Sequence, residues 1–531
     1  MNDNKNQTFM KGALILLIAN MVTKVIGMIF KIPLTYLLKP EGMAVFGAAY
    51  QIYTVMFIIA TAGLPVAISK MVSESEVKGN KEESKRILSV SLLVLTSICF
   101  AGMLALFFGA DMFANAISCP SAANAIRAIA PSIFFVGIVS AFRGFFQGHQ
   151  NMVPTAWSEV VESTGKLVFG FGLAYYFINI TSNVDMGAAG AVLGVSLGSL
   201  LACVVVVAIF IKNRKKLFDK KTDSVVSSRR NIVKNLIKIA IPITLGASVF
   251  SLTSLIDLAM IMRRLKDAGF NEDTCKFLYG SYSGYAVPMF NLPATLISSI
   301  SVSIVPAIAS AYALKDRKTV NSTVSMALKV TTIFALPCAV GLSVLAKPIL
   351  QLVYSDTSAT GTLSLLGYAV VFVSLVMVTN AVLQAMQKEK IPVINMLIGG
   401  IFKIVINYIL VGIPNVNING APIGTICCYV VILILNIFFI IKEMKVKLSV
   451  KEFVIKPILC VLVMAVAVLL TTHFTSGIHY AISTLLSILV GALVYVVMIF
   501  ALKTINYNDI LMLPKGEKLA NIMLKFGIIT K

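Results

Sequence analysis

Long apolar stretches alternate with short polar ones along almost the whole chain. A helix needs about 20 apolar residues to cross a hydrocarbon layer about 30 Å thick. The pattern therefore predicts about fourteen transmembrane helices, near residues 10–38, 43–69, 87–110, 124–147, 155–179, 186–211, 236–262, 278–310, 325–347, 361–387, 391–412, 418–441, 453–473 and 479–502. The polar segments between them are too short to fold alone. We expect an all-α integral membrane protein.

Composition supports this expectation and excludes several functions. The chain is 58% hydrophobic and only 13% charged, whereas soluble domains carry about 25% charged residues. It has no phosphate-binding GxxxxGK[ST] loop, no hydrolase-like Ser, His and Asp set, and no metal-ligand spacing of Cys or His. We therefore expect a protein that is not an enzyme and uses neither a cofactor nor a metal.

Lysine and arginine are distributed unevenly between alternate polar segments. If the N-terminus is cytoplasmic, 33 of the 45 basic residues fall on the cytoplasmic side and 6 on the outer side. Cytoplasmic loops collect Lys and Arg, so the chain is predicted to be a multi-pass protein of the bacterial cytoplasmic membrane with both termini in the cytoplasm. The net charge of +22 indicates contact with anionic lipid rather than nucleic acid.

Two parts of the chain are weakly similar at a separation of about 240 residues. GLPVAIS at 63–69 is similar to IVPAIAS at 304–310, and the spacing of Gln147, Pro154 and Lys166 recurs later in the chain as Gln384, Pro392 and Lys403. This repeat predicts two six-helix lobes related by a pseudo-two-fold, at 1–230 and 231–445, followed by a helix pair and a cytoplasmic tail at 446–531. Parallel repeats of this kind usually move around a central cavity.

Ionisable residues deep in apolar helices cost free energy and therefore indicate functional sites. Lys24 lies about 20 Å along the first helix from Lys11 at 1.5 Å per residue, and we expect it to face a cavity. Lys31 is on the same face two turns later. It either faces the cavity or extends its long side chain to the outer interface.

The fifth predicted helix carries Glu159, Glu162 and Lys166 on one face. They form either a polar stripe that faces the cavity or an internal ion pair between residues four apart. Lys403 is the counterpart of Lys166 in the second half. Asp257 is either a coupling site for Na⁺ or H⁺ or a buried partner of a lysine.

Proline residues in the helices indicate either gating bends or ordinary kinks. The candidates are Pro65, Pro293 and Pro306. Arg143, at the end of the fourth predicted helix, is a further gating or structural candidate.

Several segments together resemble one transporter family over essentially the whole chain. FRGFFQGHQNMVPTA at 142–156, followed by two glutamates, resembles the signature of helices four and five in SpoVB/YtgP-type polysaccharide transporters. YSGYAVPMFNLP at 282–293 and VPAI at 305–308 resemble the helix-eight signature of the same family. TKVIG at 23–27 resembles the basic motif on the first helix of MurJ-type flippases.

The resemblance implies the MOP superfamily (MATE, oligosaccharidyl-lipid and polysaccharide transporters), with two lobes and alternating access. It further implies export of undecaprenyl-pyrophosphate-linked sugars, above all lipid II, for peptidoglycan of the cell wall or the spore cortex. Membrane lipids and cell-wall synthesis proteins are then the expected partners. Lys24 matches a basic position that holds the pyrophosphate in MurJ proteins, and Lys31 is displaced from the next one by one residue. The family's arginines are absent here from 51–69 and 279–310, so such a grip must be built differently.

Two other functions stay open. A MATE-type drug or cation antiporter is expected to have a cavity dominated by acidic residues. A non-transporting scaffold for envelope or spore-cortex synthesis is expected to tolerate charge changes within its helices. For either transporter, the driving force is a gradient of Na⁺ or H⁺ or the membrane potential.

Overall fold

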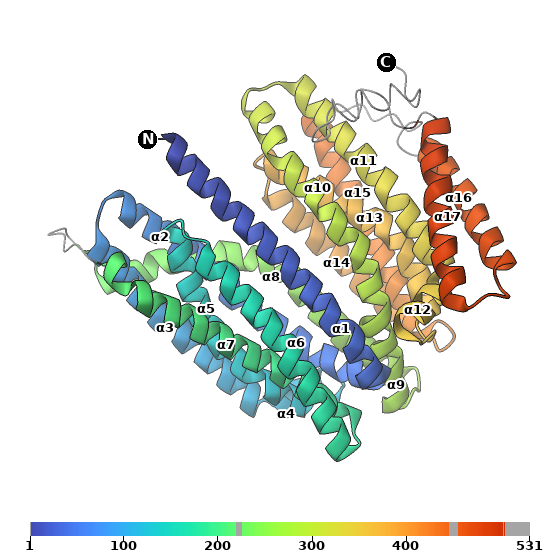
Figure 1. Ribbon diagram of the computed structural model, residues 1–531, viewed down its shortest axis with the longest axis horizontal. Helices are drawn as coiled ribbons and strands as arrows, with labels where there is room; N and C mark the ends of the chain where they lie inside the picture. The colour runs from blue at the N-terminus through green and yellow to red at the C-terminus, as the bar shows by residue number, and fades with distance from the viewer. Residues whose placement is uncertain (1, 219–225, 445–454, 503, 505–531) are drawn as a thin grey trace. The chain divides into compact units, whose positions relative to one another are not determined.

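Each of the fourteen predicted apolar segments overlaps a helix in the computed structural model, which describes residues 2–218, 226–444, 455–502 and 504 (Figure 1). The chain divides into a first unit, residues 1–284, and a second unit, residues 285–531. The first unit contains α1 (Asn2–Thr61), α2 (Leu64–Val77), α3 (Lys81–Phe108), α4 (Ala110–Ala116), α5 (Ala123–Gly148), α6 (Val153–Thr181), α7 (Val184–Leu217), α8 (Arg229–Asp267) and α9 (Glu272–Gly280). The second contains α10 (Val287–Ala313), α11 (Arg317–Val344), α12 (Ala346–Tyr354), α13 (Thr360–Ala385), α14 (Lys390–Val411), α15 (Gly420–Met444), α16 (Lys456–Phe474) and α17 (Tyr480–Ala501).

The prediction of an all-α integral membrane protein is confirmed. Ten helical stretches among the described residues are long and apolar enough to span a membrane, and the described residues contain no strand. The first predicted span and most of the second lie within α1, which is divided at Lys39, where φ is 56° and a proline follows. The predicted cytoplasmic tail lies outside the described residues, apart from Thr504.

The predicted helix at 43–69 is wrong in its extent, because the helix is interrupted at residues 62–63. Gly63 approaches the carbonyl oxygen of Ala240 so closely that an added Cβ would lie 2.2 Å from it. Pro65 stands in the first turn of α2, where its missing N–H leaves no helical hydrogen bond unmade. The GLPVAIS segment thus begins a helix instead of ending one. Pro293 and Pro306, by contrast, lie inside α10.

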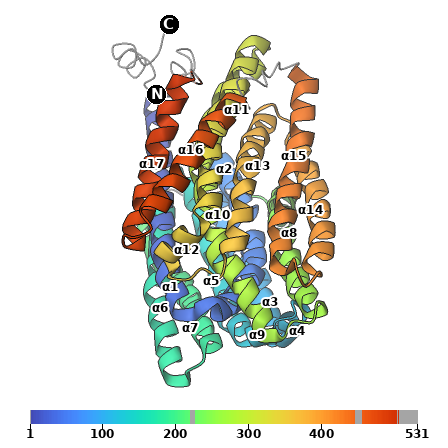
Figure 2. The same cartoon turned by 90° about the vertical axis from the view of Figure 1, so that its right-hand side faces the viewer.

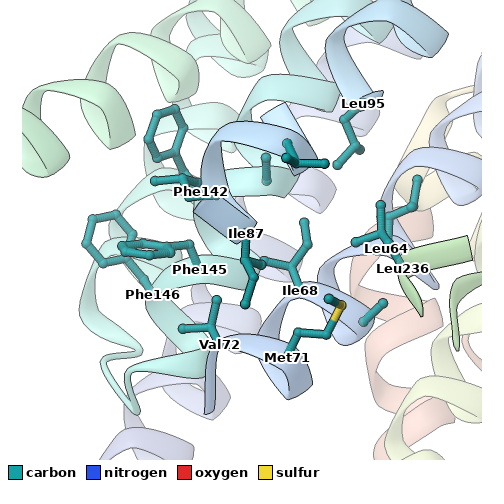
Figure 3. Packing of buried hydrophobic residues seen from close by; sticks show 14 of the residues in the cluster. Leu64, Ile68, Met71, Val72, Ile87, Leu95, Phe142, Phe145, Phe146 and Leu236 are labelled. Carbon is teal, nitrogen blue, oxygen red and sulfur yellow. The ribbon is translucent and has the colours of Figure 1, made fainter. Parts of the chain in front are cut away.

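A buried apolar cluster joins α2, α3, α5 and α8 in the first unit (Figure 3). Ile68 and Val72 of α2 belong to it together with Phe145 and Phe146 of α5, and Leu236 extends it to α8. The beginning of α8 therefore packs within the first unit. A lobe boundary near residue 230 stays a prediction.

The second unit is built around α10, α11 and α13, whose buried residues include Val320, Val324 and Val382. The C-terminal helices α16 and α17 lie side by side (Figure 2) and pack against α11. The Tyr495 hydroxyl of α17 donates a hydrogen bond to the carbonyl oxygen of Ile333, at 2.7 Å. The C-terminal helix pair thus has a defined contact with this unit.

Left-handed backbone positions recur along the chain at a separation of 235 to 237 residues. The four pairs are Gly79 and Lys315 (φ 69° and 57°), Ser118 and Ser355 (57° and 53°), Gln150 and Gln387 (58° and 60°), and Ser182 and Asn417 (52° and 41°). Such φ values are uncommon outside glycine, so four coincidences of place and conformation indicate a repeated chain path. The repeat inferred from sequence is therefore present in the local structure of both units.

Glycines allow α6 and α7 to pack backbone against backbone; the two helices run side by side in Figure 1. A Cβ on Gly194 would lie 2.1 Å from the backbone nitrogen of Gly170, and one on Gly165 would lie 2.8 Å from Cα of Gly198. Small residues at helix interfaces permit this close approach in membrane proteins.

We expect Gly194→Ala to lower the free energy of unfolding by about 1–3 kcal/mol, because the added methyl forces these two helices apart. The measurement is the thermal unfolding midpoint of the purified protein in detergent. Gly172→Ala on α6 is the matched control, since a Cβ there has nothing within 4 Å. Equal midpoints for both variants would refute the close backbone contact.

Candidate functional site

Three lysines meet in a cavity of about 370 Å³ within the first unit. Lys24 and Lys31 come from α1 and Lys166 comes from α6; we call this space the lysine cavity. The other residues that line it are Thr23, Gly27, Phe30, Phe46, Tyr50, Ser163 and Val195. Two of the lysines are seven residues apart, so two helical turns place them on one face of α1.

Aromatic rings form one wall of the lysine cavity. The ring of Phe30 lies edge-on to that of Phe46, with centroids 6.2 Å apart. Phe46 in turn stacks on Tyr50 at 5.6 Å. Because Phe30 precedes the kink at Lys39 and Phe46 follows it, these contacts join the two halves of α1. The kink thereby positions the wall of the cavity.

The charge of the lysine cavity is strongly one-sided. Its lining contains no Asp or Glu among the described residues. Lys166 is paired, since its Nζ lies 3.5 Å from Oε1 of Glu162. Among the described residues, neither Lys24 nor Lys31 has an acidic partner within ion-pair distance. Lysine ammonium groups of this kind are suited to binding phosphate as point charges.

Arg143 of α5 holds Glu162 from the other side. Its Nη2 lies 3.0 Å from Oε2 of Glu162, and its Nε donates to Oγ of Ser158 at 2.8 Å. Oγ of Ser199 on α7 donates to Oε1 of Glu162 at 3.5 Å. The side chains of Arg143 and Glu162 are only 13% and 9% exposed, so the pair is buried. We call it the Arg143–Glu162 brace.

The three ionisable residues predicted on the fifth transmembrane helix, which is α6 in the structure, therefore have different surroundings. The ion pair between Glu162 and Lys166 is present, and Lys166 also reaches the lysine cavity. Glu159 is partly buried and does not line this cavity. Its Oε2 is buried without a hydrogen-bond partner among the described residues.

The remaining candidates lie elsewhere. Asp257 is buried on α8 in the first unit and does not line the lysine cavity. Lys403 lies on α14 in the second unit and is partly buried. Their roles in ion coupling and substrate binding stay predictions.

A buried amide cluster in the second unit was missed by the sequence analysis. Asn436 of α15 donates to Oδ1 of Asn380 and to Oγ1 of Thr379, at 2.8 and 2.9 Å. It also accepts a hydrogen bond from Nδ2 of Asn395 at 2.8 Å. The signal was available, because asparagine is unusual within such apolar helices and indicates interhelical hydrogen bonding.

An ion pair also connects α9 to α7 at the predicted outer end of the first unit. Nζ of Lys276 on α9 lies 3.1 Å from Asp185 at the start of α7 and 3.4 Å from Asp273. Burial opposes the charge on Lys276, but the Asp185 carboxylate outweighs it and raises the pKa of Lys276. Since a raised lysine pKa keeps the group charged, this contact persists at neutral pH and weakens only in strongly alkaline solution.

The amino-acid sequence is similar to those of known protein families and of individual relatives. The family described as "Polysaccharide biosynthesis protein" matches residues 9–312, and the family described as MatE matches residues 283–409. Stage V sporulation protein B of Bacillus subtilis is 24% identical over 512 residues, which cover 96% of this chain and 98% of that protein. Lipid II flippase MurJ of Bacillus subtilis is 26% identical over 452 residues, which cover 82% of each chain.

Solved structures show the same fold. A lipid II flippase MurJ in an inward closed conformation has a TM-score of 0.66 at 17% identity, over 91% of this chain and 98% of that one. An inward-facing multidrug resistance MATE family transporter has a TM-score of 0.65 at 16% identity, over 82% of this chain and 98% of that one. At these identities the likeness establishes the fold alone.

Proposed function

The chain belongs to the polysaccharide biosynthesis protein family, and from that premise we propose that it is a flippase for undecaprenyl-pyrophosphate-linked sugars. Lipid II is the proposed cargo, and the movement proceeds by alternating access of the two lobes. At the coarser level, the chain is a multi-pass membrane protein with transporters and flippases among its relatives.

The observation that carries the proposal is the charge of the lysine cavity. A diphosphate that joins a lipid to a sugar is a diester and has two negative charges at neutral pH. Lys24 and Lys31 supply two positive charges without an acidic partner among the described residues. The aromatic wall offers apolar surface beside them. A dianionic headgroup therefore fits the charge balance of this cavity.

The same observation opposes the antiporter alternative. An organic cation requires carboxylates or aromatic faces free of competing cations, whereas three lysines line this cavity. A scaffold without transport gives no physical reason to place unpaired lysines there, because such charges cost free energy in a membrane.

Several finer features belong to the proposal. Asp257 serves as a coupling site for Na⁺ or H⁺, unless the membrane potential alone drives transport. Glu159 and Lys403 contribute polar surface to the transport path, and Arg143, Pro65, Pro293 and Pro306 shape its moving parts. The protein resides in the bacterial cytoplasmic membrane with both termini inside, next to cell-wall synthesis proteins, in vegetative or sporulating cells.

The test uses the full chain reconstituted in liposomes with fluorescent lipid II in the inner leaflet. We expect faster loss of fluorescence to an outside quencher than in protein-free liposomes, and no acceleration for a fluorescent phosphatidylcholine. Movement of neither lipid, or uptake of an organic cation instead, would overturn the proposal.

A further inference from the structure

Lys166 stands between a buried carboxylate and the lysine cavity. Its Nζ is 3.5 Å from Oε1 of Glu162, and its side chain is 21% exposed while that of Glu162 is 9% exposed. The same lysine lines the cavity beside Lys24 and Lys31. An anionic ligand in the cavity therefore competes with Glu162 for this ammonium group.

Glu162 remains paired if Lys166 turns away. Arg143 binds the other carboxylate oxygen at the shorter distance of 3.0 Å, and Arg143 is itself fixed by Ser158. Ser199 supplies a further donor to the oxygen that Lys166 contacts. Removing one partner from a buried ion pair is costly when it leaves a bare charge. Here the second cation prevents that cost.

The second unit indicates that the acid is not needed for helix packing. Arg143, Ser158 and Ser199 correspond to Asn380, Asn395 and Asn436, each 237 residues later. Those three amides join α13, α14 and α15 through neutral hydrogen bonds.

The two units differ most clearly at the position of Glu162. Gly399 stands at the position of Glu162, although Lys403 is retained at that of Lys166. The second unit therefore joins the corresponding three helices through neutral amides at these positions. The first unit has charged groups there, next to the lysine that lines the cavity.

We propose that Lys166 is an exchangeable cation: it binds Glu162 when the lysine cavity is empty and an anionic group of the ligand when the cavity is filled. Arg143 stays on Glu162 throughout and is the positioning residue that permits the exchange. This inference rests on the proposed function, in which the ligand is a lipid-linked diphosphate.

The exchange explains how a strongly cationic site releases its cargo. Transport requires binding that is favourable enough to load and weak enough to unload. Glu162 lowers the affinity for the anion by competing for Lys166, and it recaptures the lysine as the anion leaves. Removing that competitor should tighten binding and slow release.

The test measures equilibrium binding and dissociation of farnesyl diphosphate with the full chain in detergent, and farnesol serves as the neutral control. The double variant R143Q/E162Q removes one positive and one negative charge and so leaves the net charge unchanged. A change in affinity for farnesyl diphosphate then reports the loss of the carboxylate that competes for Lys166. We expect about tenfold tighter binding and slower dissociation, which is the size of one competing charged contact. Adding Lys166→Gln should cancel both gains.

Glu162→Asp covers the case in which the double variant does not fold. It keeps the charge but withdraws the carboxylate from Lys166 by about one carbon–carbon bond, ~1.5 Å. We expect a change in the same direction and of smaller size. Unchanged or weaker binding in a stable variant would overturn the exchange.

The two proposals fail separately in this experiment. If farnesyl diphosphate binds no better than farnesol to the unmodified protein, the proposed function fails. If it binds through Lys24 and Lys31 but the brace variants do not bind more tightly, the exchange alone fails.

Discussion

Replacing Lys24 and Lys31 together by glutamine is expected to weaken binding of farnesyl diphosphate by at least roughly a hundredfold and to stop movement of lipid II. A hydrogen bond to a charged group contributes about 1.5–3 kcal/mol, and each factor of ten in Kd corresponds to ~1.4 kcal/mol. Neither lysine has an acidic partner among the described residues that would mask its loss. The measurements are Kd and the rate of lipid II movement in liposomes.

The control removes the same charge from the surface. Lys70→Gln with Lys78→Gln changes two exposed lysines of the α2 region that do not line the cavity. This variant should bind and transport as the unmodified protein does. If the cavity variant behaves like this control, the lysine cavity is not the anion site. Binding by the cavity variant is also expected to depend less on salt, because two fewer positive charges attract the anion and salt screens that attraction.

Arg143→Ala is expected to give the largest loss of stability, about 3 kcal/mol or more, because it removes one partner from a buried ion pair. Among the described residues, Glu162 then keeps the longer contacts with Lys166 and Ser199. The measurement is the unfolding midpoint of the purified protein in detergent. Adding Glu162→Gln to this variant should recover part of the loss, since the unpaired charge disappears.

Asn380→Ala is the matched comparison at the corresponding position of the second unit. It removes a neutral hydrogen bond with Asn436 and should cost about 1–3 kcal/mol. A loss at Arg143 no larger than that at Asn380 would show that the charge of the brace has no special energetic role.

Short-range spacing accounts for what could be predicted from sequence. Lys24 and Lys31 share a face because they are seven residues apart, and Glu162 meets Lys166 because four residues separate them. Apolar length alone located the helices, since a membrane requires about 20 residues per span. Each of these features depends on periodicity within one helix.

Contacts between helices could not be predicted in the same way. Arg143 stands near the end of α5, and its sequence position indicates only an interfacial charge. Its contact with Glu162 depends on how α5 packs against α6. The break before Pro65 was missed for a similar reason, because it depends on the close approach of Gly63 to Ala240 of α8. Neighbours that are distant in sequence determine both features.

The two unpaired lysines of the cavity also have an electrical consequence. If the cavity binds a dianionic headgroup as proposed, the two negative charges offset those of Lys24 and Lys31, so the loaded cavity carries two positive charges fewer than the empty one. Under the same proposal, the empty cavity returns toward the negative cytoplasmic side with those two additional positive charges. Each elementary charge that crosses the full field gains about 2.3 kcal/mol per 100 mV. In the proposed cycle the membrane potential therefore favours the return of the empty protein, and in this way it contributes to outward delivery of the anion.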